Sequence, residues 1–74
     1  IKYGLPKTSR VRIEIFNVLG KKIITLINTR QQAGSYTLSW NGRDEYGAEM
    51  PSGIYIMRMQ TTETSQARRI MLLK

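Results

Sequence analysis

Apolar and polar residues alternate with a period of two along much of this chain. Val11, Ile13 and Ile15 alternate with Arg12 and Glu14. Such alternation predicts a strand with one face in a core and the other in water. Alternating or short apolar runs elsewhere predict further strands over residues 1–5, 21–27, 36–40 and 53–60.

Asn17-Val18-Leu19-Gly20 interrupts the pattern after the strand around Ile13. Gly20 can adopt positive φ at little cost, so these four residues predict a hairpin loop. The return strand over residues 21–27 is mostly apolar in its second half, which predicts contact on both faces, as for a strand inside a sheet. Residues 28–34 are polar, end in glycine and predict a loop.

A dense cluster of turn residues follows Trp40. Asn41-Gly42 alone would predict a tight hairpin, but the residues after it are too polar for a return strand. We therefore expect a longer ordered loop in which Asn41 and Asp44 accept hydrogen bonds from nearby backbone amides. The loop has room for a short seventh strand over residues 48–50.

The last ten residues, 65–74, fit two structures. Residues 66–73 are good helix formers, with Thr64 or Ser65 available as a cap. The rest of the chain is nevertheless predicted as strand, and a last strand would close an otherwise unpaired sheet edge. We favour a strand because tertiary context often overrides propensity.

These elements predict an all-β fold. Turn signals recur about every ten residues, the spacing typical of an immunoglobulin-like or fibronectin-like antiparallel β-sandwich of about seven strands. The 74 residues predict a single domain with a thin core. Because the chain starts at Ile1 and not at Met, we expect it to be a piece of a longer protein.

The composition argues against an enzyme. There is no Cys and no His, which removes thiol nucleophiles, the Ser-His-Asp arrangement and zinc sites built on those residues. Asp44, Glu45 and Glu49 lack the regular spacing of a calcium loop. We expect no catalytic residues, no metal, no cofactor and no small-molecule substrate.

The net charge of +7 has two interpretations. A basic stripe would bind nucleic acid or another polyanion. Lys and Arg are instead spread along the whole chain with no recognition motif, which favours solvated strand faces and charged edges that resist edge-to-edge pairing. We therefore expect no nucleic-acid partner.

The order of these features resembles a known family. The pattern comprises Ile1–Pro6, Val11–Lys21, Gly34–Tyr36, Trp40–Gly42, Gly47, Pro51–Tyr55 and Arg69–Lys74. It is similar to the type A carboxy-terminal sorting domain of proteins exported by the bacterial type IX secretion system. It also resembles the related immunoglobulin-like domain of the flagellar hook-capping protein.

This resemblance implies a non-catalytic targeting module, covalently attached to a larger upstream cargo domain and directing it through the outer membrane. The implied partners are the outer-membrane translocon and a sortase-like protease, and the implied location is secreted or cell-surface, reached through the periplasm. The alternative is an immunoglobulin-like spacer or accessory module of a surface enzyme or a hook cap. The Asn-Pro-rich segment that usually precedes the first strand in the sorting family is absent here.

In the sorting family, a Pro-x-Gly-x-Tyr element and the terminal basic-apolar strand are tied to recognition. A plainer interpretation also applies, in which Gly53 serves a turn and Tyr55 fills the core. The candidate recognition residues in this chain are Pro51, Gly53, Tyr55, Arg69, Ile70, Leu72 and Lys74.

Overall fold

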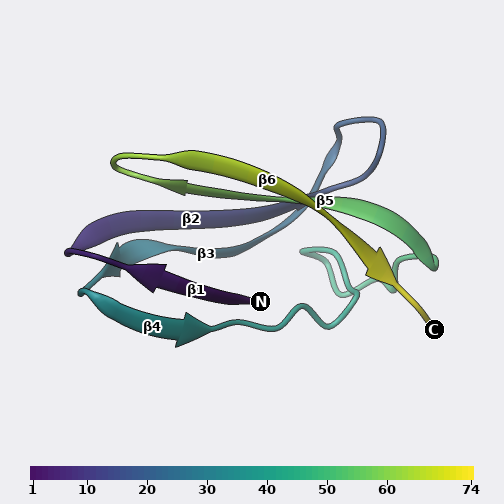
Figure 1. Ribbon diagram of the computed structural model, residues 1–74. Coiled ribbons are helices and arrows are strands. Elements are labelled where there is room, and N and C mark those ends of the chain that lie inside the picture. The colour runs from purple at the N-terminus through teal and green to yellow at the C-terminus, as the bar shows by residue number, and fades with distance from the viewer.

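The computed structural model describes residues 1–74 and contains six strands and no helix (Figure 1). A four-stranded sheet has the order β3-β2-β5-β6, and a second sheet pairs β1 with β4; every pairing is antiparallel. The strands are β1 (Lys2–Leu5), β2 (Ser9–Phe16), β3 (Lys22–Gln31), β4 (Gly34–Thr37), β5 (Gly53–Thr61) and β6 (Ser65–Leu72).

The core lies on one face of β2 and β5. Val11, Ile13 and Ile15 are completely buried, as their alternation predicts, and Tyr55 and Met57 of β5 lie beside them. The small sheet closes this core from the other side with Leu5 and with partly buried residues that pack against it, Ile1, Tyr3, Tyr36 and Leu38. The two sheets therefore share a single core.

β3 is an edge strand, so the expectation of a strand inside a sheet is wrong. The β2–β3 register shifts twice, between Ile13 and Glu14 and between Ile15 and Phe16. Each shift adds a residue to β3, which is the effect of a β-bulge. Ile23, Ile24, Leu26 and Ile27 all pack against the core because the bulges break the strict alternation of sides.

The boundaries of two neighbouring elements differ from the prediction. Residues 28–31 belong to β3 and not to a loop, because they pair with the first half of β2. β4 ends at Thr37 instead of Trp40. Ile1 and Leu38 form the last backbone pair of the small sheet, so no strand pairs with Trp40. The Trp40 side chain still packs against the core, as the alternation predicts.

Two expectations about the ends of the large sheet are confirmed. The hairpin loop turns at Gly20, whose φ is +86°. Residues 65–72 form β6 and pair with β5 along their whole length, so backbone pairing prevails over the helix propensity of this segment.

The expected count of about seven strands is not confirmed. In place of a strand over residues 48–50, the structure has an isolated bridge between Arg43 and Glu49. The structure has no helix that is long and apolar enough to cross a membrane.

Candidate functional site

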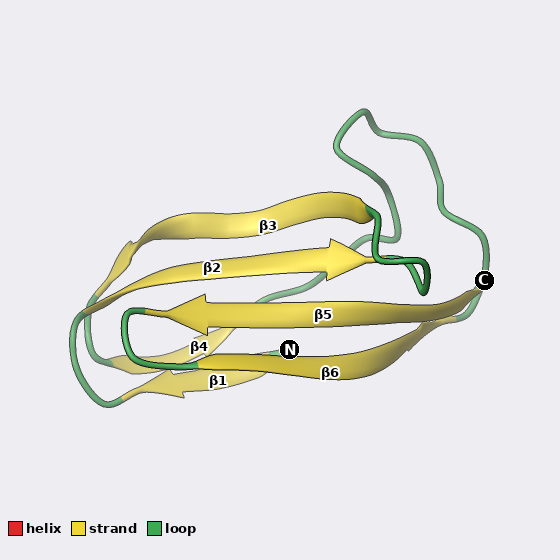
Figure 2. Cartoon of the chain, turned by 90° about the horizontal axis from the view of Figure 1, so that it is seen from above, coloured by secondary structure: helices red, strands yellow, loops and turns green.

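The two segments predicted to carry recognition lie side by side. The start of β5 pairs with the end of β6, with Gly53 opposite Leu72 and Tyr55 opposite Ile70. Figure 2 shows the two antiparallel strands side by side, with the start of β5 and the end of β6 at the end of the molecule where the C-terminus lies. Pro51 lies just before β5, and Lys74 just after β6, so the structure brings both ends of the predicted element together.

Tyr55 has a structural role. Its ring is buried and meets the Trp40 ring edge-on, with the centroids 5.0 Å apart. Its hydroxyl donates to the Pro51 carbonyl at 2.7 Å, and the indole of Trp40 donates to the Arg43 carbonyl at 2.9 Å. A tyrosine that bonds back to the backbone a few residues upstream is a hallmark of immunoglobulin-like domains. Tyr55 thus fixes the entry of the chain into β5.

The end of β6 is held by the loop that precedes β5. Gly42 is buried at φ +78°, and a Cβ there would lie 3.1 Å from a methyl carbon of Leu72. Only glycine therefore suits this position, because other residues disfavour this φ and a side chain would collide with Leu72. The amide of Lys74 donates to the Ser52 hydroxyl at 3.0 Å, and its ammonium lies 3.8 Å from Glu49.

The loop itself is ordered as the sequence predicts. The Asn41 side chain accepts from the Arg43 amide at 3.1 Å. One carboxylate oxygen of Asp44 accepts from the amides of Tyr46 and Ala48, both at 2.9 Å. The Asn41 and Asp44 side chains therefore stabilise the turns of this loop, as expected for Asx-type turns.

The candidate recognition residues divide between the two faces of the sheet. Ile70 and Leu72 are half-buried and pack against the core, together with buried Tyr55, and Gly53 is half-buried. Pro51, Arg69 and Lys74 are exposed. Only the exposed members are available to a partner.

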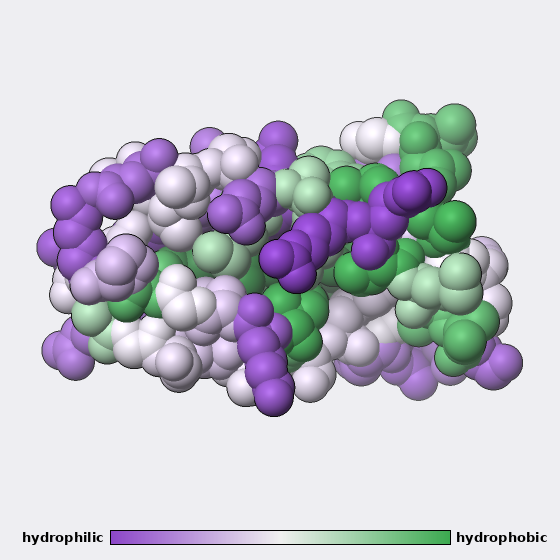
Figure 3. All heavy atoms as spheres, viewed as in Figure 1, coloured by the Kyte–Doolittle hydropathy of each residue, from purple (hydrophilic) through white to green (hydrophobic).

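The candidate recognition residues did not include three exposed apolar residues of this region. Ile54 pairs with Met71, and their side chains are 41% and 65% exposed, next to Arg69 and to Leu73, which is 77% exposed. We call Ile54, Arg69, Met71 and Leu73 the terminal patch. Ile54 and Met71 alternate with Tyr55 and Ile70, so the strand periodicity itself was a signal for them. Figure 3 shows hydrophobic side chains gathered at the end of the molecule where the C-terminus lies.

Glu14 lies on the outer face of β2 and is buried under cationic side chains. One of its oxygens is 3.0 Å from an Arg58 guanidinium nitrogen and 3.3 Å from Arg12 Nε, and the other is 3.9 Å from Lys22 Nζ. Arg58 donates a hydrogen bond, whereas Arg12 Nε interacts only through charge. Arg58 also covers the Phe16 ring at 5.0 Å. This cluster orders the outer face beside the terminal patch.

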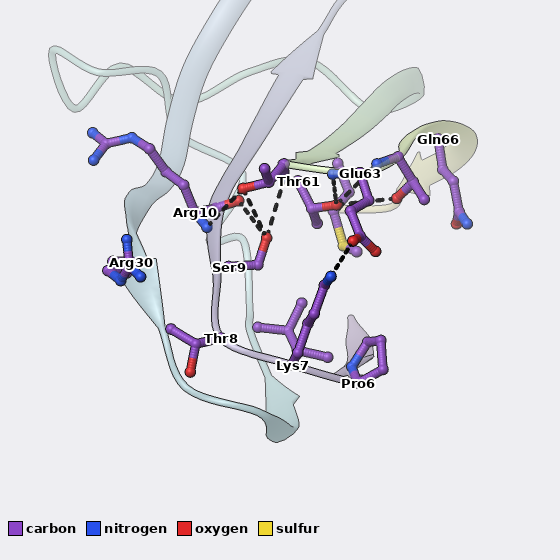
Figure 4. A pocket seen from close by; sticks show the side chains of 14 residues that line it. Pro6, Lys7, Thr8, Ser9, Arg10, Arg30, Thr61, Glu63 and Gln66 are labelled. Carbon is purple, nitrogen blue, oxygen red and sulfur yellow. Dashed lines mark hydrogen bonds and ion pairs between the residues drawn. The ribbon is translucent and has the colours of Figure 1, made fainter.

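A cavity of about 500 Å³ at the opposite end is lined almost entirely by polar residues (Figure 4). The Ser9 hydroxyl lies 3.2 Å from that of Thr62 and also accepts from the Thr62 amide. Glu63 pairs with Lys7 at 2.5 Å, which raises the pKa of Lys7. These groups join the start of β2 to the β5–β6 turn.

The small sheet carries a stacked tyrosine pair. The rings of Tyr3 and Tyr36 are 5.4 Å apart, and the Tyr3 hydroxyl donates to Gln31 at 2.6 Å. Burial raises the pKa of Tyr3 and Tyr36 adds to this, while the bond to Gln31 acts in the opposite direction. These contacts attach β1 and β4 to the end of β3.

An all-β chain with a corner tyrosine near the start of a central strand is typical of an immunoglobulin-like module. The sequence matches the family model of the FlgD Ig-like domain over residues 1–65, and the chain belongs to this family. No curated protein and no solved structure is similar enough to give a match.

Proposed function

We propose that residues 1–74 act as a non-catalytic targeting module that directs an attached cargo domain through the outer membrane by type IX secretion. The observation that supports this proposal most is the pairing of the Pro51–Tyr55 segment with the end of β6, which leaves the terminal patch exposed. An apolar patch bordered by cations suits contact with another protein.

The proposed partners are the outer-membrane translocon and a sortase-like protease, and the proposed location is the cell surface or the medium. The buried candidates position the patch and do not contact the partner: Tyr55 fixes the start of β5, and Leu72 fixes the end of β6. We also propose that the shared core of the two sheets represents the immunoglobulin-like sandwich arrangement. No catalytic group, cofactor or small-molecule substrate enters this function.

A reporter fused upstream of residues 1–74, in a bacterium with type IX secretion, tests the proposal. We expect the fusion to reach the surface or the medium. The double variant Ile54→Ser/Met71→Ser changes only the outer face, so we expect it to fold and to remain in the periplasm. Tyr46→Ser is the matched control because Tyr46 is 87% exposed in the loop, away from the patch. Periplasmic retention of the unsubstituted fusion would refute the sorting role.

The family match favours a second candidate, a structural or accessory immunoglobulin-like module of a hook cap or surface enzyme. For such a spacer, the double variant should leave export unchanged. Truncation of residues 70–74 is a poorer test, because Ile70 and Leu72 pack against the core and their loss would unfold the domain.

A further inference from the structure

β1 has one unpaired edge. Ile1 and Leu38 exchange two backbone hydrogen bonds, each 2.8 Å long. Hydrogen-bonded pairs alternate along an antiparallel ladder, so Lys2 and Gly4 direct their N–H and C=O groups away from β4. No other strand pairs with β1, and these groups have no hydrogen-bond partner within the chain.

The unpaired edge opens on a groove. A space of about 610 Å³ lies between β1 and the inner side of β5 and β6. Half of its lining residues are apolar: Ile1, Tyr3, Met57, Met59 and Ile70. In Figure 2, β1 and the N-terminus lie beneath β6. The small sheet thus leaves the inner side of β6 partly uncovered.

The groove is cationic. Lys2, Arg68 and Arg69 line it, and no Asp or Glu does. None of the three cations forms an ion pair within the chain. By contrast, Arg12 of β2 and Arg58 of β5 both form ion pairs with Glu14. An incoming segment with acidic side chains would therefore find unpaired positive charge.

We propose that this groove binds an acidic, extended segment of another polypeptide, which adds to β1 as a third strand of the small sheet. Backbone bonds to Lys2 and Gly4 supply part of the affinity, as in β-augmentation. Alternate apolar side chains of the segment enter the groove, while its carboxylates meet Lys2 and Arg68. A second copy of the chain is a poor occupant, because each copy carries a net charge of +7.

The probe is an acetylated and amidated peptide in which glutamate alternates with valine over about seven positions, a typical strand length. NMR titration of residues 1–74 should shift the amide signals of Lys2, Gly4 and Arg68 in particular, and the affinity should fall as salt rises. A peptide with lysine in place of glutamate should bind at least about tenfold more weakly.

Two pairs of variants separate the contributions. Gly4→Pro removes an N–H on the open edge without changing a charge, and should weaken binding roughly three- to tenfold. Thr37→Pro is its control, since Thr37 directs its N–H to the other edge of the same sheet. Arg68→Glu should weaken binding about tenfold, whereas Lys21→Glu, in the distant hairpin, should not. If either proline variant fails to fold, Arg68→Glu and Lys21→Glu still test the proposal.

Shifts along the outer edge of β6, equal binding of the lysine peptide, or no shifts up to millimolar peptide would each overturn the proposal. Concentration-dependent dimerisation without peptide would overturn it too, because a second copy would then occupy the groove. Arg69 borders both the groove and the terminal patch, and it is left unchanged in both experiments. The residues substituted here are not members of the terminal patch, so the outcome can be distinguished from that of the export experiment.

Discussion

The inner face of β2 carries Val11, Ile13 and Ile15, none of which has exposed surface. The outer face of the same strand carries Glu14, which is buried beneath cationic side chains and not beneath a second layer of strands. The inner face removes apolar area from water and supplies most of the stability. The outer face of the sheet contributes less, and it leaves apolar side chains such as Met71 of β6 exposed.

The sharpest difference between the faces should come from Ile13→Ala. Ile13 is fully buried at the centre of the large sheet, so we expect the free energy of unfolding to fall by about 3 kcal/mol. Ile54→Ala on the outer face, where the side chain is 41% exposed, should cost less than about 1 kcal/mol. Urea denaturation measures both. Equal losses would mean that the two faces do not differ in this way.

On the outer face, Glu14→Ala should have the largest effect. It leaves Arg12, Lys22 and Arg58 close together without their shared carboxylate. Because these cations are partly exposed, we expect a loss of about 1–3 kcal/mol in the free energy of unfolding.

Glu49→Ala is the control for Glu14→Ala. Glu49 also pairs with two cations, but its side chain is 66% exposed, so the loss should be below about 0.5 kcal/mol. Chemical denaturation at low and high salt compares the two variants. An equal or larger loss for Glu49→Ala would show that burial does not make the Glu14 ion pairs more stabilising than exposed ones.

Tyr55→Phe tests a single bond at the boundary of the inner face. It removes the hydroxyl that donates to the Pro51 carbonyl and keeps the ring against Trp40. We expect a loss of about 1 kcal/mol by thermal or urea unfolding. Tyr46→Phe, in an exposed position, should change nothing measurable. If both variants behave alike, the corner bond does not stabilise the entry into β5.

The smallest expected effect depends on pH. The pKa of Tyr3 is raised above its ordinary value of 10.0, so the folded state holds the phenol proton more tightly than the unfolded chain. As pH rises past 10, the unfolded chain loses its proton first, and the free energy of unfolding falls. Tyr3→Phe lacks this loss. The stability difference between the two proteins should therefore stay constant below about pH 9 and shrink as the pH rises past 10, and a difference that stays constant above pH 10 would contradict the assignment.

Much of the loop that leads into β5 could be predicted from the sequence, because short-range patterns specify it. The turn roles of Asn41 and Asp44 depend on their own side chains and on neighbouring amides, and both are confirmed. Which candidates are exposed could not be predicted from a motif alone. Tyr55 and Ile70 face the core because their shared side of the sheet is the covered one.

The sequence by itself determined the all-β class, the alternating face of β2 and the hairpin turn at Gly20, since each depends on local backbone and side-chain preferences. Only the tertiary structure decided that residues 65–72 form a strand and that β3 is a bulged edge. In the first case, backbone bonds to β5 outweigh the helix propensity of residues 66–73. In the second, register depends on how two strands fit over a common core. The open edge of β1 also follows from strand order, which no local pattern encodes.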